Sequence, residues 1–505
     1  MKWKRPAAAL LLTAAAAGGW VALNRPVTEA DLTAVGLEAD WRLDPYPVWW
    51  PKWIVDRLPS RHEAVFVYRH PDAAWSPGAV AMLSRMAGLK SVDLSGSPAT
   101  DADVRRLLRD HPALECLYLD DTAVTDAVLP PLLRAGLIAA SADAEGVTDG
   151  ALLAAAGRRP GLLDGALARR AARAFVGGRA DDAYRWPRSD EACWSGVMQD
   201  RRGRRRSDGC YRDRNYDGEG ASAYFSWRPR GASPRRAPLP AESWRLLAAA
   251  DSLTQLTMYG IADPPEVPPP LVSWNLLLED CGVRWLAAGA AAEDLVLWEW
   301  RHGGAALTGR SFPNATEFNV QASRNDAEPL TGAFLNTIEL PVCEELIVYG
   351  TATEPGEPLR VSAARFPKAK AFYLGRLALD GATLLDMAGG DRRLYLSELP
   401  NVTDADVAAL LRRADWAGGS LDLEPGVAFG RESLRAALGE GGVTLSIDED
   451  VLPPAADARA VLKETATAEA PRTIVVLTGV APSASAELLA GREGVELVEK
   501  YDARD

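Results

Sequence analysis

The sequence contains few of the residues, and none of the short motifs, on which most enzymes rely. Its 4 histidines, His62, His70, His111 and His302, lie far apart and outside any His-Glu-x-x-His arrangement. It has no Gly-x-Ser-x-Gly elbow, no phosphate-binding loop that ends in Gly-Lys-Ser or Gly-Lys-Thr, and no Gly-x-Gly-x-x-Gly fingerprint. We therefore expect a protein that is not an enzyme, with no catalytic residues and no bound cofactor.

Cysteine is also scarce. The sequence has 5, which is too few, and odd in number, for a disulfide scaffold. Cys116 and Cys343 fall at strand positions of the repeats described below, where a buried thiol acts as a small apolar residue. Cys193 and Cys210 lie in one polar segment, and an oxidising compartment would allow a local disulfide between them. No Cys-x-x-Cys pair exists, so a zinc or thioredoxin-like site has little support.

What the sequence has instead is a repeated pattern of apolar residues. The copies are Leu89, Val92, Leu94, Thr100, Val104, Leu107 and Leu108; Leu114, Leu117, Leu119, Thr125, Leu129, Leu132 and Leu133; and a weaker Leu137, Ala140, Ala142, Thr148, Leu152, Ala155 and Ala156. Each copy begins with the alternation of a short strand and continues with the spacing of a helix. Thr100 and Thr125 are expected N-caps, with Asp101 and Asp126 in the first turn. Such units must stack on one another to bury their apolar faces.

The second copy carries the clearest resemblance to a known family. Leu114, Leu117, Leu119, Thr122, Val124, Thr125, Asp126 and Leu129 together resemble the leucine-rich repeat, in the variant where Thr replaces the usual Asn of the turn. The resemblance implies a parallel sheet on a concave side, with helices or irregular turns on the convex side. It also implies binding of other macromolecules, and it points to no particular ligand.

Related patterns continue through the C-terminal half. They are Phe312-Pro313-x-Ala315-x-x-Phe318-x-Val320, Leu340-Pro341-x-Cys343-x-x-Leu346-x-Val348, Phe366-Pro367-x-Ala369-x-x-Phe372-x-Leu374, and a capped helix at Thr403, Asp404, Val407, Leu410 and Leu411. Further strands are expected at 65–67, 253–258, 295–297, 421–423, 443–447 and 474–477. The sequence therefore predicts an α/β leucine-rich repeat solenoid, long and irregular, with one polar insertion. The alternative is two separate α/β domains with accidental periodicity.

The N-terminus indicates the compartment. Lys2, Lys4 and Arg5 precede an uncharged stretch over 6–24. This pattern is typical of a secretory signal peptide or of an N-terminal membrane anchor, and a buried soluble helix is a third alternative. The first two alternatives place the repeats outside the cytoplasm, either anchored to the membrane and facing the periplasm or secreted to the periplasm.

A Trp- and Pro-rich lead follows the apolar stretch. Its aromatic residues are Trp41, Tyr46, Trp49, Trp50 and Trp53. They fit either a cap over the first repeat or an aromatic belt at the membrane surface. An apolar N-terminus, a Trp-Pro-rich lead and Thr-Asp-type repeats together look like a class of bacterial envelope proteins.

One polar segment interrupts the repeats and carries most of the clustered positive charge. Residues 169–236 hold 17 Arg against 9 Asp and Glu, a net charge of +8 in a chain whose net charge is −13. The candidate contact residues for an anionic lipid or envelope polysaccharide are Arg204, Arg205, Arg206, Trp194 and Trp227. Nucleic acid fits this chemistry but not the compartment. The alternative is that the arginines pair with acidic groups of the same chain.

The same segment contains the start of a calcium-loop pattern. Asp213, Asn215 and Asp217 alternate and are followed by Gly218. Calcium needs several oxygen ligands and a sharp turn, which this order supplies, but Tyr224 stands where an EF-hand has its bidentate Glu. An ordinary Asp/Asn/Gly turn is the alternative.

We predict six segments, and three functions in order of support. The segments are a signal peptide or anchor over 1–25, a Trp/Pro-rich cap over 26–64, repeats over 65–168, the insertion over 169–240, repeats over 241–455, and a terminal repeat or cap over 456–505. The functions are protein binding in the envelope, binding of an anionic polymer or membrane surface, and scaffolding of an enzyme or sensor complex. Candidate binding residues at outward strand positions are Lys90, Ser91, Asp93, Glu115, Cys116 or Tyr118, Asn319, Ile347, Tyr373 and Tyr395.

Overall fold

The computed structural model describes residues 27–43, 62–69, 74–86, 89–177, 193–198, 221–226, 236–251, 253–323, 328–413, 415–416, 418–439, 443–465, 473–479 and 481–500. The chain divides into two compact units. The N-terminal unit consists mainly of the described residues up to Ala171, and the C-terminal unit mainly of those from Ser222 onward. Each unit is built on its own sheet.

The N-terminal unit has a five-stranded sheet in the order β1-β2-β3-β4-β5. Its strands are β1 (Leu37–Leu43), β2 (His62–Arg69), β3 (Ser91–Asp93), β4 (Cys116–Tyr118) and β5 (Ala139–Ser141). The intervening elements are α2 (Glu29–Thr33), α4 (Ala79–Leu83), α5 (Asp101–Asp110), the 3-10 turn η1 (Asp126–Val128), α6 (Leu129–Arg134), α7 (Asp149–Ala156) and α8 (Asp164–Gly177). β1 pairs antiparallel with β2, whereas β2 to β5 are parallel. β1 therefore covers the edge of the first repeat strand.

The apolar repeat positions form the core of this unit, as the sequence predicts. Val92, Leu117 and Ala140 are register neighbours on β3, β4 and β5, and all three are buried. Val104 on α5 and Leu132 on α6 close the same core from the helical layer. The repeat register is therefore confirmed in all three copies.

The Thr-Asp pair of each repeat does more than start a helix. Thr148 accepts the Ala151 N–H and so caps α7, as expected of an N-cap. The Asp of the preceding repeat binds the next Thr: Asp101 accepts the backbone N–H and the hydroxyl of Thr125, and Asp126 accepts the same two donors of Thr148. The Asp side chains thus tie each repeat to the next one along the chain.

The C-terminal unit has a longer sheet. Its strands, with β6 and β7 at the start of the sheet, are β6 (Cys193–Met198), β7 (Ala221–Ser226), β8 (Leu253–Tyr259), β9 (Val272–Glu279), β10 (Asp294–Trp300), β11 (Glu317–Ala322), β12 (Glu345–Tyr349), β13 (Ala371–Gly375), β14 (Arg393–Ser397), β15 (Ser420–Leu423), β16 (Thr444–Asp448), β17 (Ile474–Thr478) and β18 (Val495–Glu499). The helices are α9 (Ala241–Leu247), α10 (Gly381–Met387), α11 (Asp404–Leu411), α12 (Arg431–Ala437), α13 (Ala455–Glu464) and α14 (Ala484–Ala490). The 3-10 turns are η2 (Val283–Gly289), η3 (Ala305–Leu307), η4 (Ala333–Asn336), η5 (Ala363–Arg365) and η6 (Glu449–Val451).

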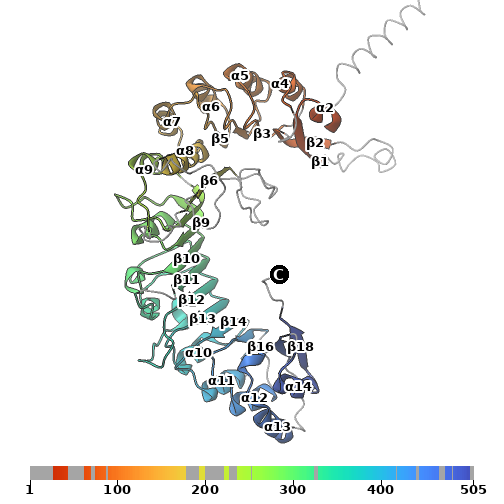
Figure 1. Cartoon of the computed structure of the whole chain (residues 1–505), viewed down its shortest axis with the longest axis vertical. Helices are drawn as coiled ribbons and strands as arrows, with labels where there is room; N and C mark the ends of the chain where they lie inside the picture. Colours follow the sequence, from red (N-terminus) through yellow and green to blue (C-terminus); the bar gives the residue numbers. More distant parts are fainter. Residues whose placement is uncertain are drawn as a thin grey trace, which may run out of the picture. The chain divides into compact units, whose positions relative to one another are not determined.

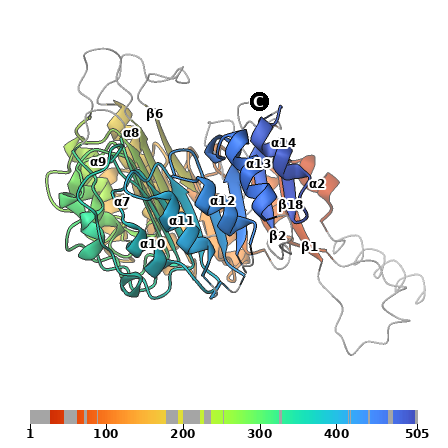
Figure 2. The same ribbon diagram turned by 90° about the horizontal axis from the view of Figure 1, so that it is seen from below.

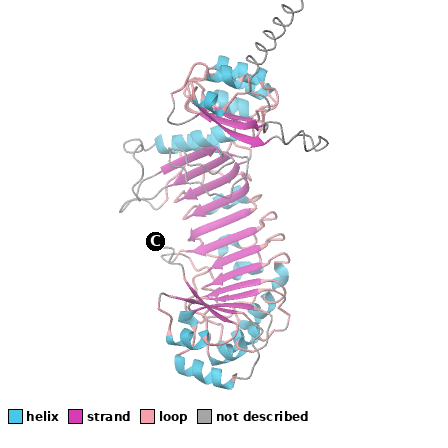
Figure 3. Cartoon of the chain, turned by 90° about the vertical axis from the view of Figure 1, so that its right-hand side faces the viewer, coloured by secondary structure: helices cyan, strands magenta, loops and turns pink. Residues whose placement is uncertain are grey.

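The strands of this sheet follow chain order. The sheet has 13 strands from β6 to β18, and every pair from β7 to β18 is parallel. Figure 3 shows these strands as a ladder of arrows that point the same way. Within the unit the strands form one layer, and the helices α10 to α13 form a second layer along one face of the sheet (Figure 1). The helices α11 to α14 pack beside one another in chain order (Figure 2).

Alternate strand residues enter the core of the C-terminal unit. Phe318, Leu346 and Phe372 are register neighbours on β11, β12 and β13, and all three are fully buried. The predicted Phe-Pro and Leu-Pro patterns therefore mark real repeats. Because the residues between these positions point to the other side of the sheet, each strand also presents an outward row.

The prediction of an α/β fold with a long parallel sheet and stacked repeats is confirmed, and two details of it are wrong. The strands form two sheets and not one continuous array. The segment after Thr125 begins as the 3-10 turn η1, because Pro130 and Pro131 stand at the first positions of α6 and fix where the α-helix starts.

The predicted N-terminal anchor or signal segment, residues 1–25, lies outside the described residues, as do Trp49, Trp50 and Trp53 of the lead. Among the residues that the structure does describe, no helix has the length and apolar character needed to cross a bilayer.

Candidate functional site

The outward positions of the N-terminal sheet are largely closed to solvent. Tyr118 is 7% exposed, so the expectation that it faces solvent is wrong. Cys116 is 3% exposed, which agrees with the expectation of a buried thiol at a strand position and excludes the outward one. Asp93 is buried as well, and Lys90 forms an ion pair of 2.6 Å with Glu115. The strands here are three residues long, so their outward side chains lie beside the polar turns at the strand ends.

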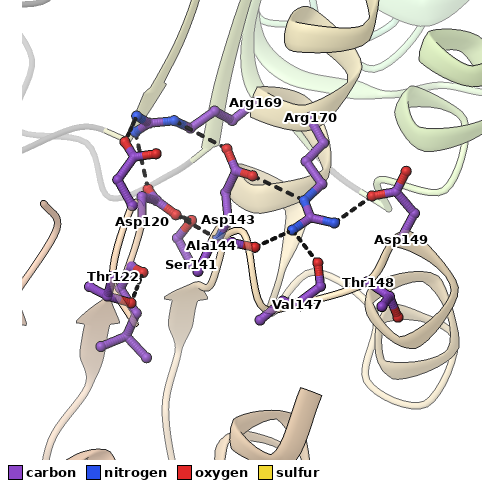
Figure 4. Close-up of polar contacts among 12 residues, drawn as sticks. Asp120, Thr122, Ser141, Asp143, Ala144, Val147, Thr148, Asp149, Arg169 and Arg170 are labelled. Carbon is purple, nitrogen blue, oxygen red and sulfur yellow. Dashed lines mark hydrogen bonds and ion pairs between the residues drawn. The ribbon is translucent and has the colours of Figure 1, made fainter. Parts of the chain in front are cut away.

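Two arginines of α8 fill those turns (Figure 4). Arg169 contacts Asp120 at 3.3 Å, Asp121 at 2.6 Å and Asp143 at 3.2 Å, and its side chain is 11% exposed. Arg170 contacts Asp143 at 3.0 Å and also pairs with Asp149. We call these six residues, with Ser141, the arginine–aspartate network.

The arginine–aspartate network satisfies its own charges. Ser141 donates its hydroxyl hydrogen to Asp120, and the backbone N–H of Asp143 donates to the same carboxylate at 2.9 Å. Burial raises the pKa of Asp120, and Arg169 opposes that shift by favouring the ionised form. For Arg169 and Arg170, the first residues of the basic segment, the intramolecular interpretation therefore holds.

The outward side of the C-terminal sheet differs. Three aromatic side chains from adjacent strands, Tyr349, Tyr373 and Tyr395, make what we call the tyrosine cluster. Tyr373 and Tyr395 are register neighbours, and their ring centroids are 5.4 Å apart. Tyr395 donates its hydroxyl hydrogen to Glu424, which follows β15. All three tyrosines remain partly exposed to solvent.

Gly375 explains how Tyr349 joins this cluster. The two residues are register partners, and a Cβ on Gly375 would lie 2.4 Å from Cδ1 of the Tyr349 ring. The absence of a side chain on β13 therefore lets this ring lie over the neighbouring strand. Burial raises the pKa of Tyr349 to about 12, with Glu424 adding to the shift, and burial and Glu424 also raise the pKa of Tyr395. The phenols are neutral donors at physiological pH.

A row of carboxylates lies next to the tyrosine cluster. Asp294, Glu317 and Glu345 occupy one register line on β10, β11 and β12, and we call them the acidic row. Among the described residues no ion pair involves any of the three. Burial raises the pKa of Asp294, and Glu293 adds to the shift. Burial raises the pKa of Glu317, with Asp294 and Glu345 adding to it.

The outward positions of β10 to β15 are acidic as a group. Asp422 joins the acidic row in facing outward, and Arg393 is the one basic residue at the outward positions of these described strands. Burial raises the pKa of Asp422, against hydrogen bonds from Ser420 and Ser446. Trp298 on β10 is 40% exposed. We call this surface the sheet face; it combines aromatic rings that are at least partly exposed with the acidic row, and with Asp422, whose carboxylate interacts with Arg393.

The predicted candidates divide between the two sheets. Tyr373 and Tyr395 come together on the sheet face with Ile347, whereas Asn319 is 8% exposed and mostly covered by its neighbours. Tyr118 lies on the N-terminal sheet. The backbone of Trp194 belongs to β6, but its side chain lies outside what the structure describes. Residues that also fall outside it are Arg204, Arg205, Arg206, Trp227, Asp213, Asn215 and Asp217.

Sequence reasoning missed the acidic row, Tyr349 and Glu424. The signal was present, because each of the row residues stands directly before a buried strand residue, Leu295, Phe318 or Leu346. That the three carboxylates share one register line depends on the lengths of the turns between strands, which the sequence pattern left open.

Metal-ligand groups and reactive thiols were the remaining candidates for chemistry among the described residues. No group of three or more His, Cys, Asp or Glu among them is placed to hold a metal ion. Cys116, Cys281 and Cys343 are buried, and burial raises the pKa of the Cys281 and Cys343 thiols to about 12, so neither Cys281 nor Cys343 is a ready nucleophile.

Comparison with known proteins adds no family assignment. The chain matches no protein-family model and no curated protein.

Proposed function

We propose that this chain is a non-catalytic protein of the leucine-rich repeat type that holds a protein partner on its sheet face. The observation that carries the proposal is the tyrosine cluster, because tyrosines are enriched at interface centres and give large contact area at low entropic cost, and these three are partly exposed on adjacent strands. The acidic row beside the cluster supplies polar contacts at its edge.

The repeat pattern supports the family part of this proposal. The leucine-rich repeat resemblance implies parallel strands whose side chains alternate between the core and the outward face, and a Thr-Asp turn. The chain has parallel strands and Thr-Asp turns of this kind. A repeat array buries its core between neighbours and offers a long surface in place of one deep pocket. Such a surface suits a macromolecular partner better than a small substrate.

The compartment is a second part of the proposal and rests on the sequence. The basic residues Lys2, Lys4 and Arg5 before the apolar stretch support a signal peptide or anchor. The partner would then be an envelope protein that meets the chain in the periplasm, near the membrane if the segment is retained.

Site-specific photo-crosslinking in the native host tests the interaction. Benzoylphenylalanine replaces Tyr373 on the sheet face in one full-length variant, and Ala405 on the exposed side of α11 in the control. We expect one protein adduct of discrete mass from position 373 and none from position 405. Absence of an adduct at 373, or equal adducts at both positions, would contradict the proposal.

The purified crosslinked partner then gives the energetic test. We expect Tyr373→Ala to weaken its binding by about 2 kcal/mol or more, the size of an interface hot spot, while Ala405→Ser leaves it unchanged. Equal affinity of the Tyr373→Ala variant and the original chain would remove the tyrosine cluster from the interface.

A further inference from the structure

We propose that the sheet face recognises a cationic segment of its partner: an extended peptide with Arg or Lys at alternate positions that lies along the acidic row and against the tyrosine cluster. This inference rests on the proposed function and specifies the chemistry of the partner.

The charge of the face is the first support. Asp294, Glu317 and Glu345 repel one another across adjacent strands, and no ion pair in the described part of the chain relieves that repulsion. Other acidic residues of the same unit are compensated: Asp280 contacts both Arg236 and Arg301, at 2.9 and 3.2 Å. A cation at the acidic row would be attracted by its three carboxylates and would reduce the repulsion among them. An anionic ligand would instead meet four outward carboxylates and one arginine.

The aromatic rings are the second support. A guanidinium group stacks on the face of a tyrosine ring and pairs with a carboxylate through two parallel hydrogen bonds. Tyr373 lies next to Glu345 closely enough that the carboxylate contributes to raising the pKa of the phenol, after burial. The Tyr373 ring and the Glu345 carboxylate are therefore close enough for one side chain to contact both, and arginine fits this pair better than lysine does.

The spacing of the row fits an extended peptide. Neighbouring parallel strands are about 4.8 Å apart, so the acidic row spans roughly 10 Å over three strands. Alternate residues of an extended peptide lie about 7 Å apart on one side. Two cationic residues separated by one other residue can thus both reach the row, and a third can reach the tyrosine cluster. The partner segment should therefore carry a cationic residue at every second position.

Peptide binding to the purified full-length chain tests the inference by fluorescence anisotropy. The probe is a labelled peptide of alternating Arg and Ser, compared with alternating Lys and Ser and with alternating Glu and Ser. The face variant is Asp294→Asn, Glu317→Gln and Glu345→Gln. The control is Glu266→Gln, Glu354→Gln and Glu357→Gln, which removes the same charge from exposed turns of the same unit.

We expect the Arg peptide to bind and the Glu peptide not to bind. The face variant should weaken Arg-peptide binding at least about tenfold, or 1.4 kcal/mol, and the control variant less than about twofold. The Arg peptide should bind more tightly than the Lys peptide, and Tyr373→Leu should remove that preference.

Equal weakening by the face and control variants would show diffuse attraction to an acidic chain and overturn the inference. Failure of the Arg peptide to bind, or its displacement by a neutral glucan, would also overturn it. The crosslinking at position 373 reports separately: an adduct to a partner segment without cationic residues would leave the interaction function standing and refute the cationic partner alone.

Discussion

The two sheets of this chain use their outward sides in opposite ways. In the N-terminal unit the strands β3 to β5 have three residues each, and the charges beside them are neutralised by Arg169 and Arg170. In the C-terminal unit the strands β12 to β14 have five residues each and present the tyrosine cluster, and β10 to β12 carry the acidic row. The same repeat pattern therefore gives a self-contained scaffold in one unit and an available surface in the other.

The difference shows what a repeat does not determine. Inward positions are constrained by the core in both units, so their residues follow the apolar pattern. Outward positions are free of that constraint, and what occupies them decides whether a face is closed or open. A function assigned to one sheet is for this reason not transferable to the other.

The largest expected effect comes from breaking the arginine–aspartate network. Arg169→Ala leaves the buried carboxylate of Asp120 without its counter-charge and leaves Asp143 with Arg170 alone. We therefore expect a loss of about 3–5 kcal/mol in the unfolding free energy of the N-terminal unit. Arg109→Ala is the matched control, because Arg109 pairs with Asp110 but is 72% exposed, and such pairs contribute at most about 1 kcal/mol. Denaturant unfolding measures both. Equal losses of unfolding free energy in the two variants would mean that Arg169 does not neutralise the buried carboxylates as described.

The basic segment gives the next test. Arg204, Arg205 and Arg206 are predicted either to bind an anionic surface or to pair within the chain, as Arg169 does. If they bind a surface, replacing the three with Glu should weaken sedimentation with phosphatidylserine vesicles by about 3 kcal/mol, since each basic residue contributes about 1 kcal/mol near such a surface. Stability should not change. A loss of stability without a loss of vesicle binding would mean that these arginines pair with acidic groups of the same chain, as Arg169 does.

Asp404 tests the ties between repeats in the C-terminal unit. Its carboxylate accepts the N–H groups of Gly430, Glu432 and Ser433 at 2.7, 3.0 and 2.9 Å, at the start of α12. We expect Asp404→Ala to cost about 1–2 kcal/mol at neutral pH, as for loss of a helix cap. Glu354→Ala, on an exposed turn, is the control.

The pH dependence of that effect has a definite sign. Burial alone would raise the pKa of Asp404, but the donors from Ser433 and Gly430 outweigh it and lower the pKa. A lowered folded pKa gives stability that is present above the unfolded value and is lost as the pH falls through the folded value. The difference between Asp404→Ala and the original chain should therefore shrink in acid. A constant difference would contradict the assignment.

The smallest effect has the opposite sign and concerns the acidic row. Because burial and the neighbouring carboxylates raise the pKa of Glu317, its ionised form destabilises the folded state. Glu317→Gln should raise the unfolding free energy by about 0.2–1 kcal/mol at pH 7, the size of a cross-strand charge effect. The gain should fade as the pH falls below the raised pKa. Destabilisation by this change would mean that the row is already compensated.

Much of the fold follows from the sequence because the repeat pattern reports burial directly. Phe318, Leu346 and Phe372 identify three strands, and Thr403 identifies the start of α11. Strand β9 was not predicted, because its three consecutive leucines do not alternate and Trp274 and Asn275 interrupt the apolar run. The break into two sheets was expected only under the alternative of two separate α/β domains, because the polar segment between them has no repeat spacing from which to judge whether the sheet continues.

The candidate site was predictable only in part. Tyr373 and Tyr395 stood out because both occupy the outward position between two buried strand residues. Whether an outward residue is exposed depends on what covers it from elsewhere in the chain, and this separates Tyr118 from Tyr373 although their repeat positions are alike. The acidic row required the strand register, which comes from pairing and not from spacing alone.

Radical footprinting of tyrosine side chains, read by mass spectrometry with and without the alternating Arg peptide, tests the central claim most directly. We expect Tyr373 to be modified in the free chain and protected by the peptide, and Tyr118 to be unreactive in both samples. Modification of Tyr118 to the same extent as Tyr373, or no protection of Tyr373 at saturating peptide, would contradict it.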